Sequence, residues 1–69
     1  MKNKLAERIK EPRVEKGYNQ NKLATLCKVK QSCVSKWERG ETLPDAEMII
    51  TLAETFNVTT DFLLGIKDY

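Results

Sequence analysis

Residues 20–39, QNKLATLCKVKQSCVSKWER, decide the fold of this 69-residue chain. They contain two short segments, 20–27 and 31–39, in which apolar side chains recur three and four positions apart. This spacing is typical of an α-helix with one buried face. Only three residues join the segments, and the middle one, Val29, can fill the inside of a tight turn. The stretch therefore predicts a helix-turn-helix.

The second segment has two chemically different sides. At about 100° per residue, Cys33, Val34 and Trp37 fall together on an apolar side, which we expect to face the core. The opposite side carries only amide, hydroxyl and cationic groups, on Gln31, Ser32, Ser35, Lys36 and Arg39. Glutamine can pair with adenine, lysine with guanine and serine with several base edges in the major groove, which admits one helix. The polar side therefore favours contact with double-stranded DNA, and the alternative is an ordinary solvated helix face.

Three further helices surround this pair. One is expected over residues 4–16, one after Pro44 with Asp45 in or near its first turn, and a short one over 60–64. The clearest core stripe is Ile49, Leu52, Ala53 and Phe56, and Asn19 and Thr59 are candidate N-caps. No segment alternates with the period of a half-buried strand. The sequence predicts an all-α fold, with residues 1–69 forming one domain.

Pro12 stands in the interior of the first expected helix. An interior proline removes one backbone hydrogen bond and clashes with the carbonyl four residues earlier, here that of Arg8, at a cost of about 3 kcal/mol. We therefore predict a kink, or an interruption near residues 8–11.

The composition excludes several classes of protein. Two cysteines, Cys27 and Cys33, and no histidine rule out a disulfide framework and a four-ligand Cys/His zinc site. No apolar run approaches the roughly 20 residues of a membrane span, and the start of the chain, residues 1–4, is charged rather than apolar. We expect a cytoplasmic protein with reduced thiols, and no cofactor, metal, membrane or small-molecule partner. Without histidine or a Gly-rich phosphate loop, an enzyme is not expected.

The net charge of +2 hides an uneven distribution. Residues 1–40 hold eleven Lys/Arg and four Glu, a net +7, whereas residues 41–69 hold one Lys and six Asp/Glu, a net −5. A basic first half favours a polyanionic partner such as a nucleic acid, although chance asymmetry of a solvated surface is the alternative.

The sequence resembles the phage repressor/Cro family of helix-turn-helix proteins, also called Xre-type, over nearly its whole length. The resemblance is carried by Asn19-Gln20, Leu23-Ala24, Val29, Val34-Ser35-Lys36-Trp37-Glu38-Arg39-Gly40, Leu43-Pro44, Leu52-Ala53, Val58, Asp61 and Leu63-Leu64-Gly65. It implies a compact five-helix, lambda-repressor-like domain. It also implies binding to operator DNA, usually as a dimer on half-sites about one helical turn apart.

The resemblance also assigns roles. It implies base reading by Gln31, Ser32 and Lys36, a groove-facing Ser35, a phosphate anchor at Gln20 helped by Asn19, and backbone contacts by Arg39 and Thr42. It further implies an ion pair between Arg13 and Glu38. The chain departs from the family pattern at Pro12, at Cys33, at Lys28 in place of the turn glycine, and at Lys30 in place of a Ser/Thr cap. Lys30 places a cation where a phosphate is expected.

We expect a sequence-specific transcriptional regulator, most simply a repressor. A protein-interaction module, such as the antitoxin half of a toxin-antitoxin pair, is the alternative function. Val14, Leu64, Ile66 and Tyr69 form a candidate homodimer patch, unless they are scattered surface hydrophobes. The two cysteines are expected to be small core residues, with a redox switch as the alternative.

Overall fold

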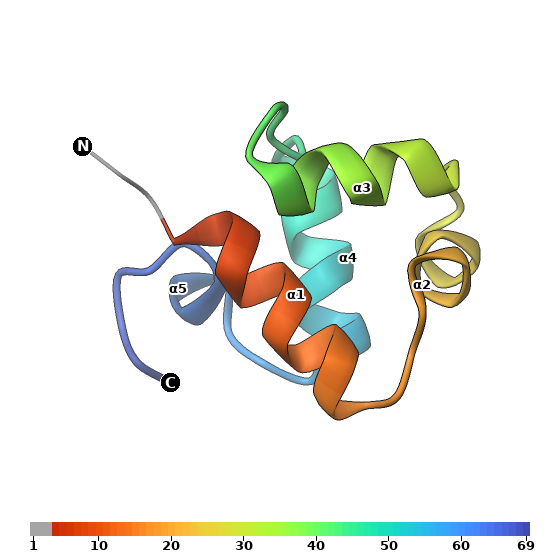
Figure 1. Ribbon diagram of the computed structural model, residues 1–69. Coiled ribbons are helices and arrows are strands. Elements are labelled where there is room, and N and C mark those ends of the chain that lie inside the picture. The colour runs from red at the N-terminus through yellow and green to blue at the C-terminus, as the bar shows by residue number, and fades with distance from the viewer. Residues whose placement is uncertain (1–3) are drawn as a thin grey trace.

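Five α-helices make up the fold of residues 4–69, the part of the chain that the computed structural model describes (Figure 1). They are α1 (Leu5–Glu15), α2 (Gln20–Cys27), α3 (Gln31–Arg39), α4 (Ala46–Phe56) and α5 (Thr60–Leu63). In the view of Figure 1, α3 lies across the top of the molecule, α2 lies to its right, and α5 lies near both chain ends. The predicted all-α, five-helix architecture is confirmed, while the charged start at residues 1–3 falls outside the described residues.

Three helices begin at side-chain caps. The backbone N–H of Lys22 donates to Asn19 Oδ1 over 2.7 Å, and that of Met48 donates to Asp45 Oδ1 over 2.9 Å. The hydroxyl of Thr59 accepts in the same way, at the start of α5. Each cap satisfies one backbone donor that the first turn leaves unpaired. The sequence therefore placed the starts of α2, α4 and α5 correctly, and Asp45 is the N-cap itself.

Helix α1 continues through Pro12 as one element, so the predicted interruption near residues 8–11 is wrong. Pro12 is buried against the core, and its carbonyl accepts the backbone N–H of Lys16 over 3.0 Å. A proline ring holds φ close to the helical value, so the chain loses one hydrogen bond without leaving the helix. Burial of the apolar ring offsets part of that loss.

The turn between α2 and α3 is built by backbone geometry. Lys28 adopts the left-handed conformation, with φ 60° and ψ 40°, and the N–H of Val29 donates to the carbonyl of Ala24 over 2.9 Å. A left-handed lysine costs about 1–2 kcal/mol relative to the right-handed conformation. Lys30, the N-cap position of α3, makes no side-chain cap, as its departure from the family pattern suggested. Val29 is partly buried, as expected for the residue inside the turn.

The hydrophobic core lies where α1, α4 and α5 meet the α2–α3 pair. Its most completely buried side chains are Ile9, Leu23, Val34, Leu52 and Leu63. The α4 stripe faces inward as predicted, although Ile49 is only partly buried at the edge. Since Val34 and Trp37 belong to this core, α3 cannot rotate without exposing them, and its polar side is fixed outward.

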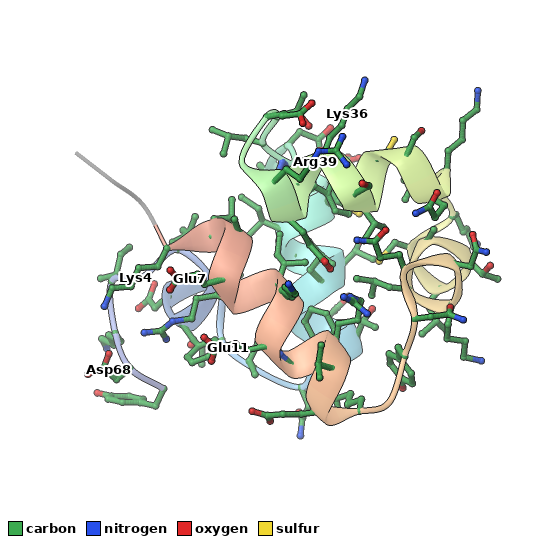
Figure 2. The ribbon with its side chains drawn as sticks, viewed as in Figure 1. Lys4, Glu7, Glu11, Lys36, Arg39 and Asp68 are labelled. Atoms are coloured by element: carbon green, nitrogen blue, oxygen red, sulfur yellow. The ribbon has the colours of Figure 1, made fainter. Side chains whose placement is uncertain are left out.

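Arg8 ties the end of the chain to α1. Its guanidinium lies 4.2 Å from the centre of the Phe62 ring and donates to the carbonyls of Phe62 and Lys67, each over 3.4 Å. It also pairs with Asp68, which is labelled on the segment after α5 in Figure 2, over 3.3 Å. These contacts hold the residues after α5 against α1, and so fix where Ile66 and Tyr69 are exposed.

Candidate nucleic-acid interface

Helix α3 presents two flanks of opposite character, as the sequence predicted. On its inner flank, Val34 is completely buried and Trp37 is 7% exposed. The outer flank consists of Gln31, Ser32, Lys36 and Arg39, which are exposed, and Ser35, which is half-buried. In Figure 2, Lys36 projects from α3 away from the rest of the fold, whereas Glu7 and Glu11 project from α1. The outer flank therefore offers amide, hydroxyl and cationic groups to the surroundings.

An ion pair between Arg13 of α1 and Glu38 of α3 supports this helix from behind. Arg13 Nε lies 2.6 Å from Glu38 Oε2, and Arg13 Nη2 lies 3.0 Å from Oε1, so the pair is bidentate. Arg13 also donates to the carbonyl of Tyr18 over 2.8 Å. The two side chains are only 12% and 4% exposed, which shields their attraction from solvent. The predicted pair is confirmed, and it fixes the position of α3 relative to α1.

The same carboxylate connects to the outer flank through two glutamines. Gln20 Nε2 donates to Glu38 Oε1 over 3.1 Å, and Gln31 Nε2 donates to Gln20 Oε1 over 2.6 Å. The chain of hydrogen bonds therefore runs from the buried ion pair to the first residue of α3. One consequence is that the Gln20 side chain is occupied within the protein. A second is that Gln31 is held in a defined orientation while its amide oxygen and second amide hydrogen stay available.

At the other end of α3, Arg39 has two partners on the outer surface. Its guanidinium bonds to the hydroxyl of Ser35, one turn earlier, and to the carboxylate of Glu41 beyond the helix. The hydrogen bond from Arg39, aided by the charge of Lys36, holds the pKa of the Glu41 carboxyl below its usual value. Sequence reasoning did not single out Glu41, because the contact depends on the chain reversal at Gly40, where φ is 73°.

The predicted DNA-facing residues that remain lie around this helix. Asn19 and Lys30 are exposed at the starts of α2 and α3, and Thr42 is exposed in the connection that follows Gly40. Asn19 uses its side-chain oxygen to cap α2. The structure thus joins Gln20 to Gln31 and Ser35 to Arg39, while Asn19, Lys30 and Thr42 lie exposed at the ends of the two helices or just beyond α3.

The described residues show no features of a metal centre or a membrane span. Within residues 4–69, no group of three or more His, Cys, Asp and Glu side chains could hold a metal ion. No helix in this range is long and apolar enough to cross a bilayer. Cys27 is buried and Cys33 is half-buried, both as free thiols. Burial raises the pKa of the Cys27 thiol, although a hydrogen bond with Thr55 partly opposes that shift.

The chain is similar to known helix-turn-helix proteins. The profile of the family described as Helix-turn-helix matches residues 9–63. The HTH-type transcriptional regulator ImmR of Bacillus subtilis is 36% identical over 61 residues, which cover 88% of this chain and 48% of ImmR. The chain thus spans about half the length of that curated relative.

Solved structures agree with the sequence comparison. A transcriptional regulator from Listeria innocua superposes with a TM-score of 0.87 at 32% identity, covering 94% of this chain and 61% of the other. The P22 c2 repressor, in a crystal structure with a synthetic operator, superposes with a TM-score of 0.83 at 32% identity, covering 87% of this chain and 91% of the repressor chain. By profile, sequence and fold, this chain belongs to the Xre/Cro-like helix-turn-helix family, the family of regulators that its sequence resembles.

Proposed function

We propose that this chain binds operator DNA and regulates transcription, most simply as a repressor, by inserting α3 into the major groove. One observation carries the proposal: the outer flank of α3 is exposed and polar, while the inner flank is locked into the core. The similarity to the P22 c2 repressor, whose structure includes a synthetic operator, supports operator binding.

Base reading is assigned to Gln31, Ser32 and Lys36. Gln31 keeps one amide hydrogen and its amide oxygen free when it donates to Gln20. These two groups match N7 and N6 of adenine, and the bond to Gln20 sets the amide plane before DNA arrives. Lys36 can donate to guanine O6 and N7, and Ser32 can adapt to several base edges.

Phosphate contacts are assigned to the ends of the two helices. The first backbone N–H groups of α2, beside Asn19 and Gln20, form a site of positive potential that suits a phosphate. Arg39 on the outer flank of α3, and Lys30 and Thr42 close to its two ends, are exposed donors. Such contacts set register and affinity without reading sequence, and the net +7 of residues 1–40 favours them.

We further propose that two copies bind together through the candidate patch near the end of the chain. Leu64, Ile66 and Tyr69 are 40%, 68% and 75% exposed, and Val14 is exposed as well. Half-sites read by such pairs lie about 34 Å apart. The longest extent of residues 4–69 is 27 Å, so two copies fit side by side at that spacing.

Selection of binding sites from random duplex DNA tests the proposal. We expect a palindromic consensus, and we expect Gln31→Ala to relax preference at one base pair per half-site, at a cost of about 1–3 kcal/mol. Recovery of no preferred sequence would reject sequence-specific binding. A non-palindromic consensus bound by a single copy would reject the dimer alone, and an unchanged preference in Gln31→Ala would reject that assignment.

A further inference from the structure

Arg39, an outer-flank cation assigned to phosphate contact, is already engaged by an acid of the same chain. Its guanidinium bonds to the carboxylate of Glu41 and to the hydroxyl of Ser35. The Arg39 and Glu41 side chains are 54% and 51% exposed, so the pair stands in solvent on the surface that would face DNA. A negative charge at this place opposes the approach of a polyanion.

A carboxylate and a phosphate bind an arginine through the same hydrogen-bonding geometry. Both accept two parallel N–H bonds from the planar guanidinium fork, and both carry negative charge. Arg39 gives Glu41 one such bond, from Nε, and gives Ser35 another, from Nη1. A phosphate that takes both bonds on the Nε side of the fork therefore has to displace Glu41. Because exposed ion pairs are weak, a DNA phosphate can displace Glu41 from Arg39. Breaking the pair nevertheless reduces the net free energy that the phosphate contact contributes to binding.

The backbone holds Glu41 in this competing position. Gly40 adopts the left-handed conformation, with φ 73°, and the N–H of Glu41 then donates to the carbonyl of Lys36 over 2.9 Å. The chain thus folds back over the last turn of α3. This turn places the Glu41 side chain beside Arg39, so the contact is set by the backbone and not only by the conformations of two long side chains.

We propose that Glu41 is an intramolecular competitor of DNA phosphate for Arg39, and that it lowers the sequence-independent part of DNA affinity. The inference rests on the proposed DNA binding. Since phosphate contacts carry no base information, Glu41 weakens binding to operator and to random DNA by the same factor. The specificity ratio is unchanged, and residence on non-specific DNA is shortened.

Titration of Glu41 supplies an independent signature. In the free protein the groups facing its carboxylate are Arg39, which hydrogen-bonds to it, and Lys36, and together they lower its pKa. When a phosphate takes Arg39, that hydrogen bond is lost and the pKa rises. Binding then takes up a proton as the pH falls through the range in which glutamate carboxyls ordinarily titrate, so wild-type affinity rises there relative to a variant without the carboxylate.

The test compares Glu41→Gln with Glu11→Gln, which removes the same charge from α1. Glu11 is exposed and is drawn on α1, away from Lys36 and Arg39, in Figure 2. Binding of each variant to a selected operator duplex and to a shuffled duplex is measured by fluorescence anisotropy between low and high salt. We expect Glu41→Gln to tighten both duplexes equally, by about two- to five-fold at low salt, with less gain at high salt. Glu11→Gln should change affinity less.

A double-mutant cycle separates competition from simple repulsion. In an Arg39→Gln background, Glu41 has no guanidinium to occupy, so Glu41→Gln should lose most of its effect there. An equal gain in both backgrounds would overturn the proposal, as would equal affinities for the Glu41→Gln and Glu11→Gln variants. Failure of the wild type to bind any duplex would reject the proposed function together with this inference. With wild-type binding intact, the first two outcomes reject the inference alone.

Discussion

Two arginine–glutamate pairs use neighbouring positions of α3 and have opposite surroundings. Glu38 pairs with Arg13 on the inner side, where the side chains are 4% and 12% exposed. Arg39 pairs with Glu41 on the outer side, where the side chains are 54% and 51% exposed. The chemical groups are the same, so burial and the additional partners account for the difference between the pairs.

Both members of the inner pair are fully hydrogen-bonded to neighbouring groups, so a ligand cannot replace either of them. Glu38 accepts from Arg13 and Gln20, and Arg13 also donates to the carbonyl of Tyr18. Loss of one partner would leave a buried charge without compensation. The outer pair lies in water, where either partner can be replaced by solvent or a ligand. One pair therefore maintains the fold, and the other is suited to exchange during binding.

The largest expected effect is on the inner pair. Glu38→Gln removes the buried negative charge that compensates Arg13 and should lower the free energy of unfolding by about 3 kcal/mol, a large share of the stability of a small domain. Thermal and urea unfolding followed by circular dichroism measure the loss, with Glu11→Gln as the exposed control. An unchanged melting temperature would show that the pair is not a structural support.

A smaller effect, of a different kind, is expected on the outer pair. Arg39→Gln should leave the melting temperature within about 2 °C of wild type, because the side chain is exposed. It should weaken binding to operator and shuffled duplexes alike, and lower the slope of log affinity against log salt by about 1. A loss confined to the operator would instead make Arg39 a base-reading residue. A large drop in melting temperature would remove the contrast with Glu38.

The smallest expected effect is a difference in reactivity between the two thiols, Cys27 and Cys33. Cys27 is buried and its pKa is raised by that burial, so the fraction of reactive thiolate at pH 8 is lowered. Cys33 is half-buried on α3. Iodoacetamide in limiting amount should therefore label Cys33 first, as read by peptide mass spectrometry, and label both residues equally in urea. Faster labelling of Cys27 in the native protein would show that the inner side of α2 is open to solvent, which contradicts the structure.

Much of this organisation follows from local rules. The apolar spacing of α3 predicts which flank is buried, because Val34 and Trp37 fall together at the helical period. Asn19 and Thr59 mark helix starts, because their side chains satisfy donors within the same turn. The Arg13–Glu38 pair, in contrast, was predicted from family resemblance, since no local rule links positions 25 apart.

The remainder depends on backbone geometry and packing. The continuity of α1 through Pro12 was not predicted, because apolar spacing places the ring on the inner face but does not tell how far its burial offsets the missing hydrogen bond. The Glu41–Arg39 contact needs the left-handed turn at Gly40, and the Gln20–Gln31 bond needs the angle between α2 and α3. Ile49 fits the core stripe of α4 by spacing, yet it is only partly buried against the core.

The most direct test of the central claim, that the outer flank of α3 meets DNA, is a titration of labelled protein with the selected duplex, followed by backbone amide chemical shifts. We expect the largest shifts at residues 31–39 and in the first turn of α2, with little change in the first turns of α1. Strong shifts confined to α1 and α5, with α3 unperturbed, would contradict the account.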